Sequence, residues 1–198
     1  MKKLFIGLFV VLASAVWLLP SSAIAQQKFV IKKLVTKKVA ELPAGVLYWR
    51  IENFPSLAQA HAAEGPVALV AESRGKVWLF TLGPAGGSTA GGTKVAEVGP
   101  IPRIVARQYM LRINEATGSP GSVTSQHHHP GSEAFYVLAG EQTIRSPKGV
   151  LRVKAGHPET GNGADIPMQV SSTGSEDLHS LVMFVVDATK PFSTRVKF

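Results

Sequence analysis

The sequence predicts an all-β protein, either a sandwich or a barrel, and three observations support this. Many short apolar segments follow one another along the chain. Turns rich in Gly and Pro separate them, as in the hairpin signal Ser73-Arg74-Gly75. The 198 residues are 45% hydrophobic and only 17% charged. That composition supports one domain, or two small ones at most, with a sizeable core, and it argues against wholesale disorder.

The elements are expected in the following order. Residues 26–42 carry a loose apolar pattern that fits a helix or a strand equally well. The alanine-rich stretch 56–64 predicts a short helix, and residues 83–93, rich in Gly, Pro, Ser and Thr, predict a flexible loop within a single domain. Strands are predicted at residues 67–72, 76–82, 106–113, 133–138, 141–146, 150–153, 168–170 and 178–186.

The first 25 residues have the layout of a secretory signal peptide. Lys2 and Lys3 precede an apolar run at 4–19, and Ala23-Ile24-Ala25 has the small-x-small form of a cleavage site. The run is shorter than the ~20 residues that span a bilayer, which favours cleavage over an uncleaved membrane anchor. We therefore expect an exported protein, periplasmic or secreted, that begins at Gln26 and has no membrane partner after cleavage.

The charge pattern does not indicate a nucleic-acid partner. The formal net charge is +8, but the cations are scattered apart from five lysines between residues 28 and 38, and the export signal also argues against nucleic-acid binding. That basic segment is interpreted as a solvated N-terminal tail, with a flexible basic arm or a short helix near a membrane surface as alternatives. The chain has no Cys, which excludes disulfides and thiolate metal sites.

The segment from Gly121 to Gly140 carries the strongest chemical signal. Side chains two residues apart in a strand share a face, so the imidazoles of His127 and His129 can reach one ion while His128 points away. A turn then returns the chain, so that Glu133 can approach the same point. Two imidazole nitrogens and a carboxylate suit a divalent first-row transition metal.

The spacing in this segment resembles the first conserved motif of the cupins. That motif is Gly, five residues, His-x-His, three residues, Glu, six residues, Gly, and every element is present. The resemblance covers roughly residues 106–190. It implies a cupin-type jelly-roll barrel at 66–198, preceded by the signal peptide at 1–25 and by an N-terminal extension at 26–65 with a short helical segment. A homodimer is expected by analogy alone.

The second cupin motif is degenerate. Gly161 and Pro167 are correctly spaced, but Gln169 then replaces a glycine, and Ser172 or Met168, depending on the alignment, takes the position of the fourth ligand, a histidine. His157 is expected to be exposed, and His179, which could point into the barrel, is expected to be a core or edge histidine. The resemblance therefore implies three ligands, His127, His129 and Glu133, for Fe, Mn, Zn or Ni, which the sequence does not distinguish.

The sequence leaves open whether the protein is an enzyme. A three-ligand site with open positions would suit oxidation or isomerisation of a small polar or phenolic molecule. The alternative is a periplasmic cupin that binds or senses a small molecule without catalysis, with a weak or empty metal site. A third hypothesis is an interaction protein that uses the basic segment. Fold does not decide among these.

Overall fold

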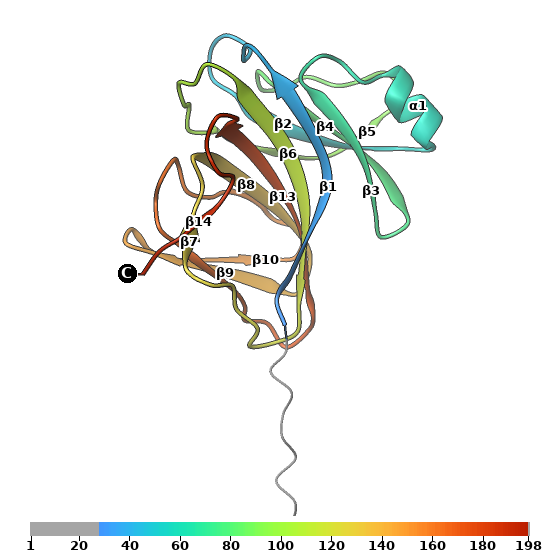
Figure 1. The fold of residues 1–198 in the computed structure, drawn as a ribbon. Helices are drawn as coiled ribbons and strands as arrows, with labels where there is room; N and C mark the ends of the chain where they lie inside the picture. Colours follow the sequence, from blue (N-terminus) through green and yellow to red (C-terminus); the bar gives the residue numbers. More distant parts are fainter. Residues whose placement is uncertain (1–27, 198) are drawn as a thin grey trace, which may run out of the picture.

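The computed structural model describes residues 28–197, and the predicted signal peptide lies outside them. Two antiparallel sheets form a barrel (Figure 1). The first has the order β1-β6-β13-β8-β11 and consists of β1 (Val30–Val39), β6 (Tyr109–Gly118), β13 (Leu178–Asp187), β8 (Gly131–Ala139) and β11 (Pro158–Thr160). The second consists of β10 (Gly149–Lys154), β9 (Glu141–Ser146) and β12 (Gln169–Ser172), in that order, while β7 (His127–His128) pairs with β14 (Thr194–Arg195).

The strand order is that of a jelly roll. β6 pairs with β13, β8 with β11, and β9 with β12, so neighbours in the sheets are distant in sequence, as two interlocked Greek keys require. The bridge between Val123 and Ser171 ties the chain before β7 to the second sheet. The prediction of an all-β, cupin-type jelly-roll barrel is confirmed. Residues 26–42, for which the sequence left helix or strand open, contribute β1, which extends the first sheet beyond β6.

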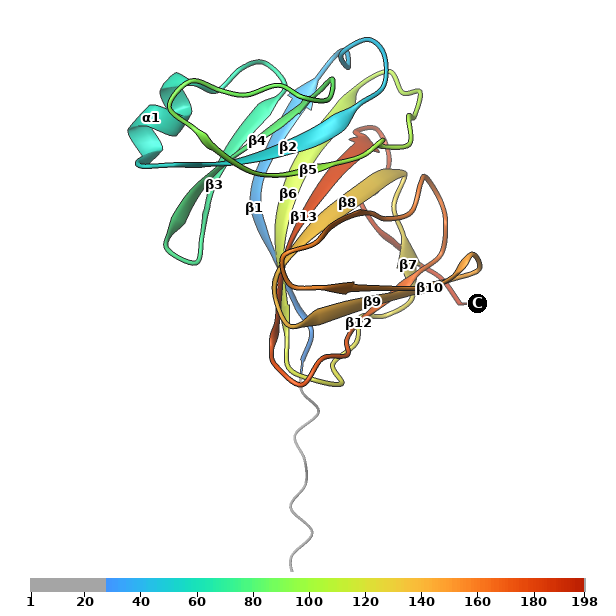
Figure 2. The ribbon, with the colours of Figure 1, turned by 180° about the vertical axis from the view of Figure 1, so that it is seen from behind.

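A third sheet covers the outside of the barrel (Figures 1 and 2). Its order is β3-β4-β2-β5, formed by β3 (Ala68–Ser73), β4 (Lys76–Gly83), β2 (Tyr48–Phe54) and β5 (Thr93–Val98). The predicted division between residues 65 and 66 runs through this sheet, because β2 pairs with both β4 and β5. Apart from β1, the strands of the two barrel sheets begin at Tyr109, after the third sheet is complete.

The predicted short helix is α1 (Leu57–Ala62), at the edge of the third sheet. The Ser56 side chain caps it by accepting a hydrogen bond from the Gln59 amide, and Ala60 is buried against the sheet. Among residues 28–197, no helix has the length and apolar character needed to cross a membrane.

Two cores share the central sheet. The outer face of β13 presents Leu181, Met183 and Val185, which pack with residues of the third sheet, including Trp49 and Phe80. The inner face of the same strand presents three residues to the barrel interior: Val182, Phe184 and Val186. Because both faces are buried, residues 181–186 are apolar without interruption instead of alternating with polar residues.

The packing of Gly131 gives a test of this fold. A Cβ atom there would collide with the Val185 carbonyl oxygen and lie 2.5 Å from the Val186 Cα. We expect Gly131→Ala to lower the free energy of unfolding by about 1–3 kcal/mol, as overpacking does. Gly83→Ala is the matched control, because its Cβ would have no heavy atom within 4 Å. Urea unfolding of the two variants measures the effect, and equal stabilities would contradict the described register.

Candidate functional site

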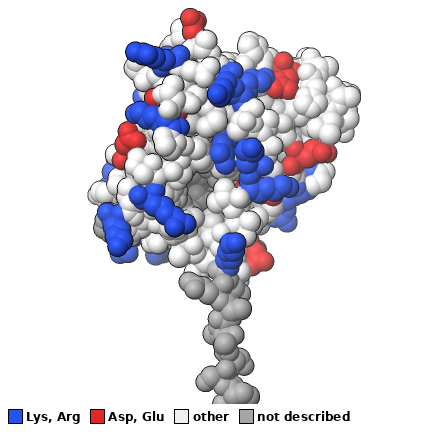
Figure 3. Space-filling view, in the orientation of Figure 1, with Lys and Arg blue, Asp and Glu red and all other residues white. Residues whose placement is uncertain are grey.

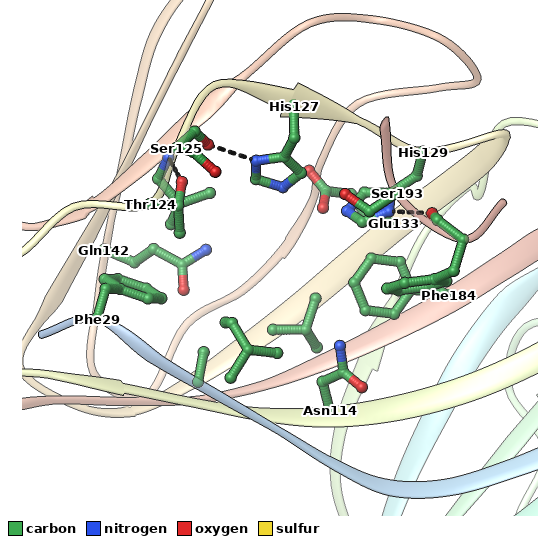
Figure 4. Close-up of a pocket in the computed structure, with 15 residues that line it drawn as sticks. Phe29, Asn114, Thr124, Ser125, His127, His129, Glu133, Gln142, Phe184 and Ser193 are labelled. Atoms are coloured by element: carbon green, nitrogen blue, oxygen red, sulfur yellow. Dashed lines mark hydrogen bonds between the residues drawn. The ribbon is translucent and has the colours of Figure 1, made fainter. Parts of the chain in front are cut away.

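The barrel encloses a cavity of about 260 Å³ that opens to the surface (Figure 4). On the surface, Lys and Arg side chains stand around a hollow (Figure 3). Its apolar walls come mainly from β1, the segment before it, and β13. Its polar groups come from β6, β8, β9, the segment that contains β7 and the C-terminal segment before β14. The apolar lining residues are Phe29, Ile31, Ala116, Val170, Val182, Phe184 and Phe192, and the polar ones are Asn114, Thr124, Ser125, His127, His129, Glu133, Gln142 and Ser193.

The three residues predicted as metal ligands line this one cavity (Figure 4). The imidazole centroids of His127 and His129 lie 5.0 Å apart, with the rings nearly perpendicular. Glu133 reaches the cavity from β8, close to Gly161, where a Cβ atom would lie only 2.6 Å from the Glu133 Cγ. His128 does not line the cavity: its Nδ1 atom lies 3.1 Å from the Asp165 carboxylate.

Backbone carbonyls hold both cavity imidazoles. The Nδ1 atom of His127 lies 2.7 Å from the Ser125 carbonyl oxygen, and that of His129 lies 2.7 Å from the Phe192 carbonyl oxygen. A carbonyl can only accept, so each neutral ring carries its proton on Nδ1 and leaves the Nε2 lone pair free. Metal-binding histidines are commonly oriented by such an outer hydrogen bond.

Burial sets the protonation of the site. It lowers the pKa of His129 to about 4, assisted by the nearby charges of His127 and Arg112 and opposed by the hydrogen bond to Phe192. Burial raises the pKa of Glu133 to about 7, and only the Asn162 backbone N–H, 3.5 Å from the carboxylate, opposes this. Near neutral pH, His129 is therefore an uncharged nitrogen donor, and Glu133 is partly protonated.

The C-terminal segment supplies one wall of the cavity. The Phe192 ring packs on His129 and Phe184, with centroids 4.6 and 5.0 Å away. The Arg112 guanidinium lies over the Phe192 ring, 3.8 Å from its centroid. Pairing of β14 with β7 fixes the segment beside the histidines. The motif gave no signal for this wall, because Phe192 lies 63 positions beyond His129.

None of the fourth-ligand candidates is among the residues lining the cavity. Met168 is buried, and its Sδ atom lies 3.9 Å from the Asn162 side-chain nitrogen. His179 lies on the outer side of the sheet instead of inside the barrel, with Nε2 2.9 Å from the Glu115 carboxylate and Ser73 beside it. His157 is exposed, with its Nδ1 atom near the Ala155 carbonyl.

The donor atoms suit a divalent metal in chemical type, with two oriented imidazoles and a buried carboxyl that has only one weak hydrogen bond. Within residues 28–197, however, no group of three or more His, Cys, Asp or Glu side chains is gathered closely enough to hold an ion. The three predicted ligands therefore share a cavity without forming a preorganised metal centre.

No protein-family model matches the chain, and no curated protein matches it. Solved structures are similar over part of its length. A DMSP lyase is 17% identical with a TM-score of 0.39, over 44% of this chain and 44% of that one. A cupin superfamily protein from Desulfitobacterium hafniense is 16% identical with a TM-score of 0.35, over 39% and 68%. An oxalate oxidase bound to glycolate is 19% identical with a TM-score of 0.37, over 43% and 46%.

The chain thus matches less than half the length of the DMSP lyase and of the oxalate oxidase. The fold is assigned from the chain's own strand order, which is that of a cupin-type jelly-roll barrel. The resemblance predicted from the spacing of Gly121 to Gly140 is confirmed at the level of the fold.

Removing the Phe192 ring tests how His129 is held. We expect Phe192→Ala to raise the pKa of His129 from about 4 toward the ordinary 6.5, by at least about one unit, because the ring's burial disfavours the imidazolium. The backbone carbonyl of residue 192 remains. Phe29→Ala also enlarges the cavity, but the rings that pack on His129 are those of His127, Phe184 and Phe192, so Phe29→Ala is the control. NMR titration of the imidazole protons measures both, and an unchanged value in Phe192→Ala would refute the wall's role.

Glu133 predicts a pH dependence of stability in metal-free protein. Its folded pKa, about 7, lies above the ordinary 4.5, so its contribution is complete below pH 4.5 and is lost as the pH rises through 7. Glu133→Gln cannot ionise, so it should gain stability relative to wild type between pH 5 and 8, by about 2–3 kcal/mol. Urea unfolding in the presence of a chelator measures this. A difference that stays constant across the range would show that Glu133 titrates ordinarily.

Proposed function

We propose that this protein is an exported, cupin-type small-molecule-binding protein that holds a divalent transition metal through His127, His129 and Glu133. The observation that carries the proposal is that these three donors line one barrel cavity, with the Nδ1 atoms of both imidazoles hydrogen-bonded to carbonyls. The export part rests on the signal-peptide pattern of residues 1–25.

Metal binding in this proposal closes the site instead of filling a finished one, because the ligands are not gathered beforehand. The three side chains would lose few hydrogen bonds on moving toward the ion. Glu133 would bind the ion through a carboxylate that has only one long hydrogen bond, and His127 and His129 would bind it while they keep their carbonyl contacts. When bound, the ion would supply Lewis acidity and open coordination positions, which suit oxidation or isomerisation of a small molecule. The chain's own residues would orient that molecule and exclude water.

A second candidate is a binding or sensing protein without catalysis. Two observations favour it: none of the predicted fourth-ligand candidates among the described residues lines the cavity, and apolar or aromatic side chains make up most of its wall surface. In this case the metal is weak or absent and the cavity binds a small molecule alone. A homodimer stays a prediction by analogy in both cases.

Metal analysis tests the first proposal. After refolding with Fe(II), Mn(II), Zn(II) or Ni(II) and desalting, the wild type should retain about one ion per chain, and His129→Ala should fall to background because one of three ligands is lost. His157→Ala removes an exposed histidine outside the cavity and should match the wild type. Equal metal content in His129→Ala and wild type would refute the proposed ligand set.

Oxygen uptake and substrate turnover separate the two candidates. Metal-loaded wild type that consumes oxygen or isomerises a small phenolic or polar substrate supports the enzyme. Retained ligand binding with metal content at background supports the sensing or carrier protein.

A further inference from the structure

We infer that the barrel cavity selects a small, uncharged aromatic alcohol, of which phenol is the simplest case, and that Gln142 recognises its hydroxyl group. The inference rests on the proposed function only in taking this cavity as the ligand site. It adds the chemical class of the ligand and a specificity-determining residue outside the predicted metal ligands.

The apolar walls favour a flat ring. Phe29 and Ile31 line the cavity from the N-terminal side of the barrel, while Val182 and Phe184 line it from β13. Phe184 is held in place by edge contacts with the Phe192 ring, 5.0 Å away. Aromatic side chains in such a cavity stabilise another ring through offset or edge-to-face contacts in addition to its burial. The volume, about 260 Å³, lies just below the ~300 Å³ at which sites for drug-sized ligands begin, so one ring with a small substituent suits it.

Gln142 supplies an unused polar group in this apolar surrounding. It lies in the middle of the second sheet, between Val153 and Ser172, and its side chain lines the cavity although the residue is only 2% exposed. Its Oε1 atom has no hydrogen-bond partner among the described residues. Because a buried acceptor without a partner destabilises the fold, a ligand that brings a donor is favoured here. A hydroxyl group can donate to the amide oxygen and accept from the amide nitrogen.

The charges of the lining argue against an anion. None of the described residues that line the cavity is Lys or Arg. The nearby guanidinium of Arg112 already donates to the Asn114 side-chain oxygen, 2.7 Å away, and lies over the Phe192 ring. A carboxylate placed deep in the cavity would therefore be desolvated without a counter-charge, beside the Glu133 carboxyl. The Lys and Arg side chains stand on the surface around the hollow (Figure 3), and none of those that the structure describes lines the cavity.

Three probes of similar size test the class of ligand: phenol, which is neutral and donates a hydrogen bond, anisole, which is neutral and only accepts, and benzoate, which is an anion. Binding to metal-free, full-length mature protein is measured by ligand-observed NMR and calorimetry. We expect phenol to bind about tenfold more tightly than anisole, the worth of one hydrogen bond in a buried site, and benzoate to bind more weakly than both.

Gln142→Leu tests the residue. It should bind anisole at least as tightly as the wild type and lose the preference for phenol, so that the phenol-to-anisole ratio falls to about one. Gln108→Leu is the same substitution at an exposed position outside the cavity and should keep the wild-type ratio. The ratio within one variant is informative even if the variant is less stable, because both probes meet the same folded population.

Benzoate binding as tight as phenol, an unchanged ratio in Gln142→Leu, or no binding of any probe would each overturn the inference. These outcomes are distinct from failure of the proposed metal site. Phenol selectivity without retained metal refutes only the metal ligands, whereas retained metal without phenol selectivity refutes only the inference about the ligand.

Discussion

The structure depends on a central sheet that is apolar on both faces. Along β13, Leu181, Met183 and Val185 point out of the barrel while Val182 and Phe184 point into it. A barrel with such an outer face would expose a large apolar patch, which soluble chains avoid. The third sheet removes it by packing Trp49 and its neighbours there. The third sheet therefore also supports the cavity, because it covers the outer face of the strands that carry Glu133 and Phe184.

The packing on both faces of the central sheet matters because the buried polar groups of the cavity lower the free energy of unfolding. Glu133 is buried with one weak hydrogen bond, and the pKa shifts of Glu133 and His129 both show that burial disfavours their charged forms. Gln142 leaves an acceptor without a partner among residues 28–197. The buried Glu133 carboxyl, the His129 imidazole and the Gln142 amide oxygen each destabilise the ligand-free barrel. Such unfavourable groups persist only where the surrounding structure fixes their geometry. The two cores on either side of the central sheet provide that rigidity.

The sequence predicted what is local. The spacing of His127, His129 and Glu133 placed them around one cavity, because strand alternation and one tight turn are short-range rules. The hairpin at Ser73 to Gly75, the helix at residues 57–62 and most strands were predicted for the same reason. The wall made by Phe192 was not, since nothing near His129 indicates which distant carbonyl its Nδ1 will meet. The pairing of β2 with β4 and β5 was missed likewise, because alternation shows that a strand has a buried face but does not show which sheet it joins.

The fold explains what the region of the degenerate second motif, around Met168, does in this protein. Met168 is buried beside Asn162, and its backbone pairs with His127, so that region packs and positions the first histidine instead of supplying a ligand. Because none of the predicted fourth-ligand candidates within residues 28–197 lines the cavity, a metal at His127, His129 and Glu133 would depend on drawing these side chains together, and its affinity would be lower than at a preorganised centre of the same donors. A molecule that fills the apolar half of the cavity would therefore lie against Phe184 and Phe192, the two rings that pack on His129.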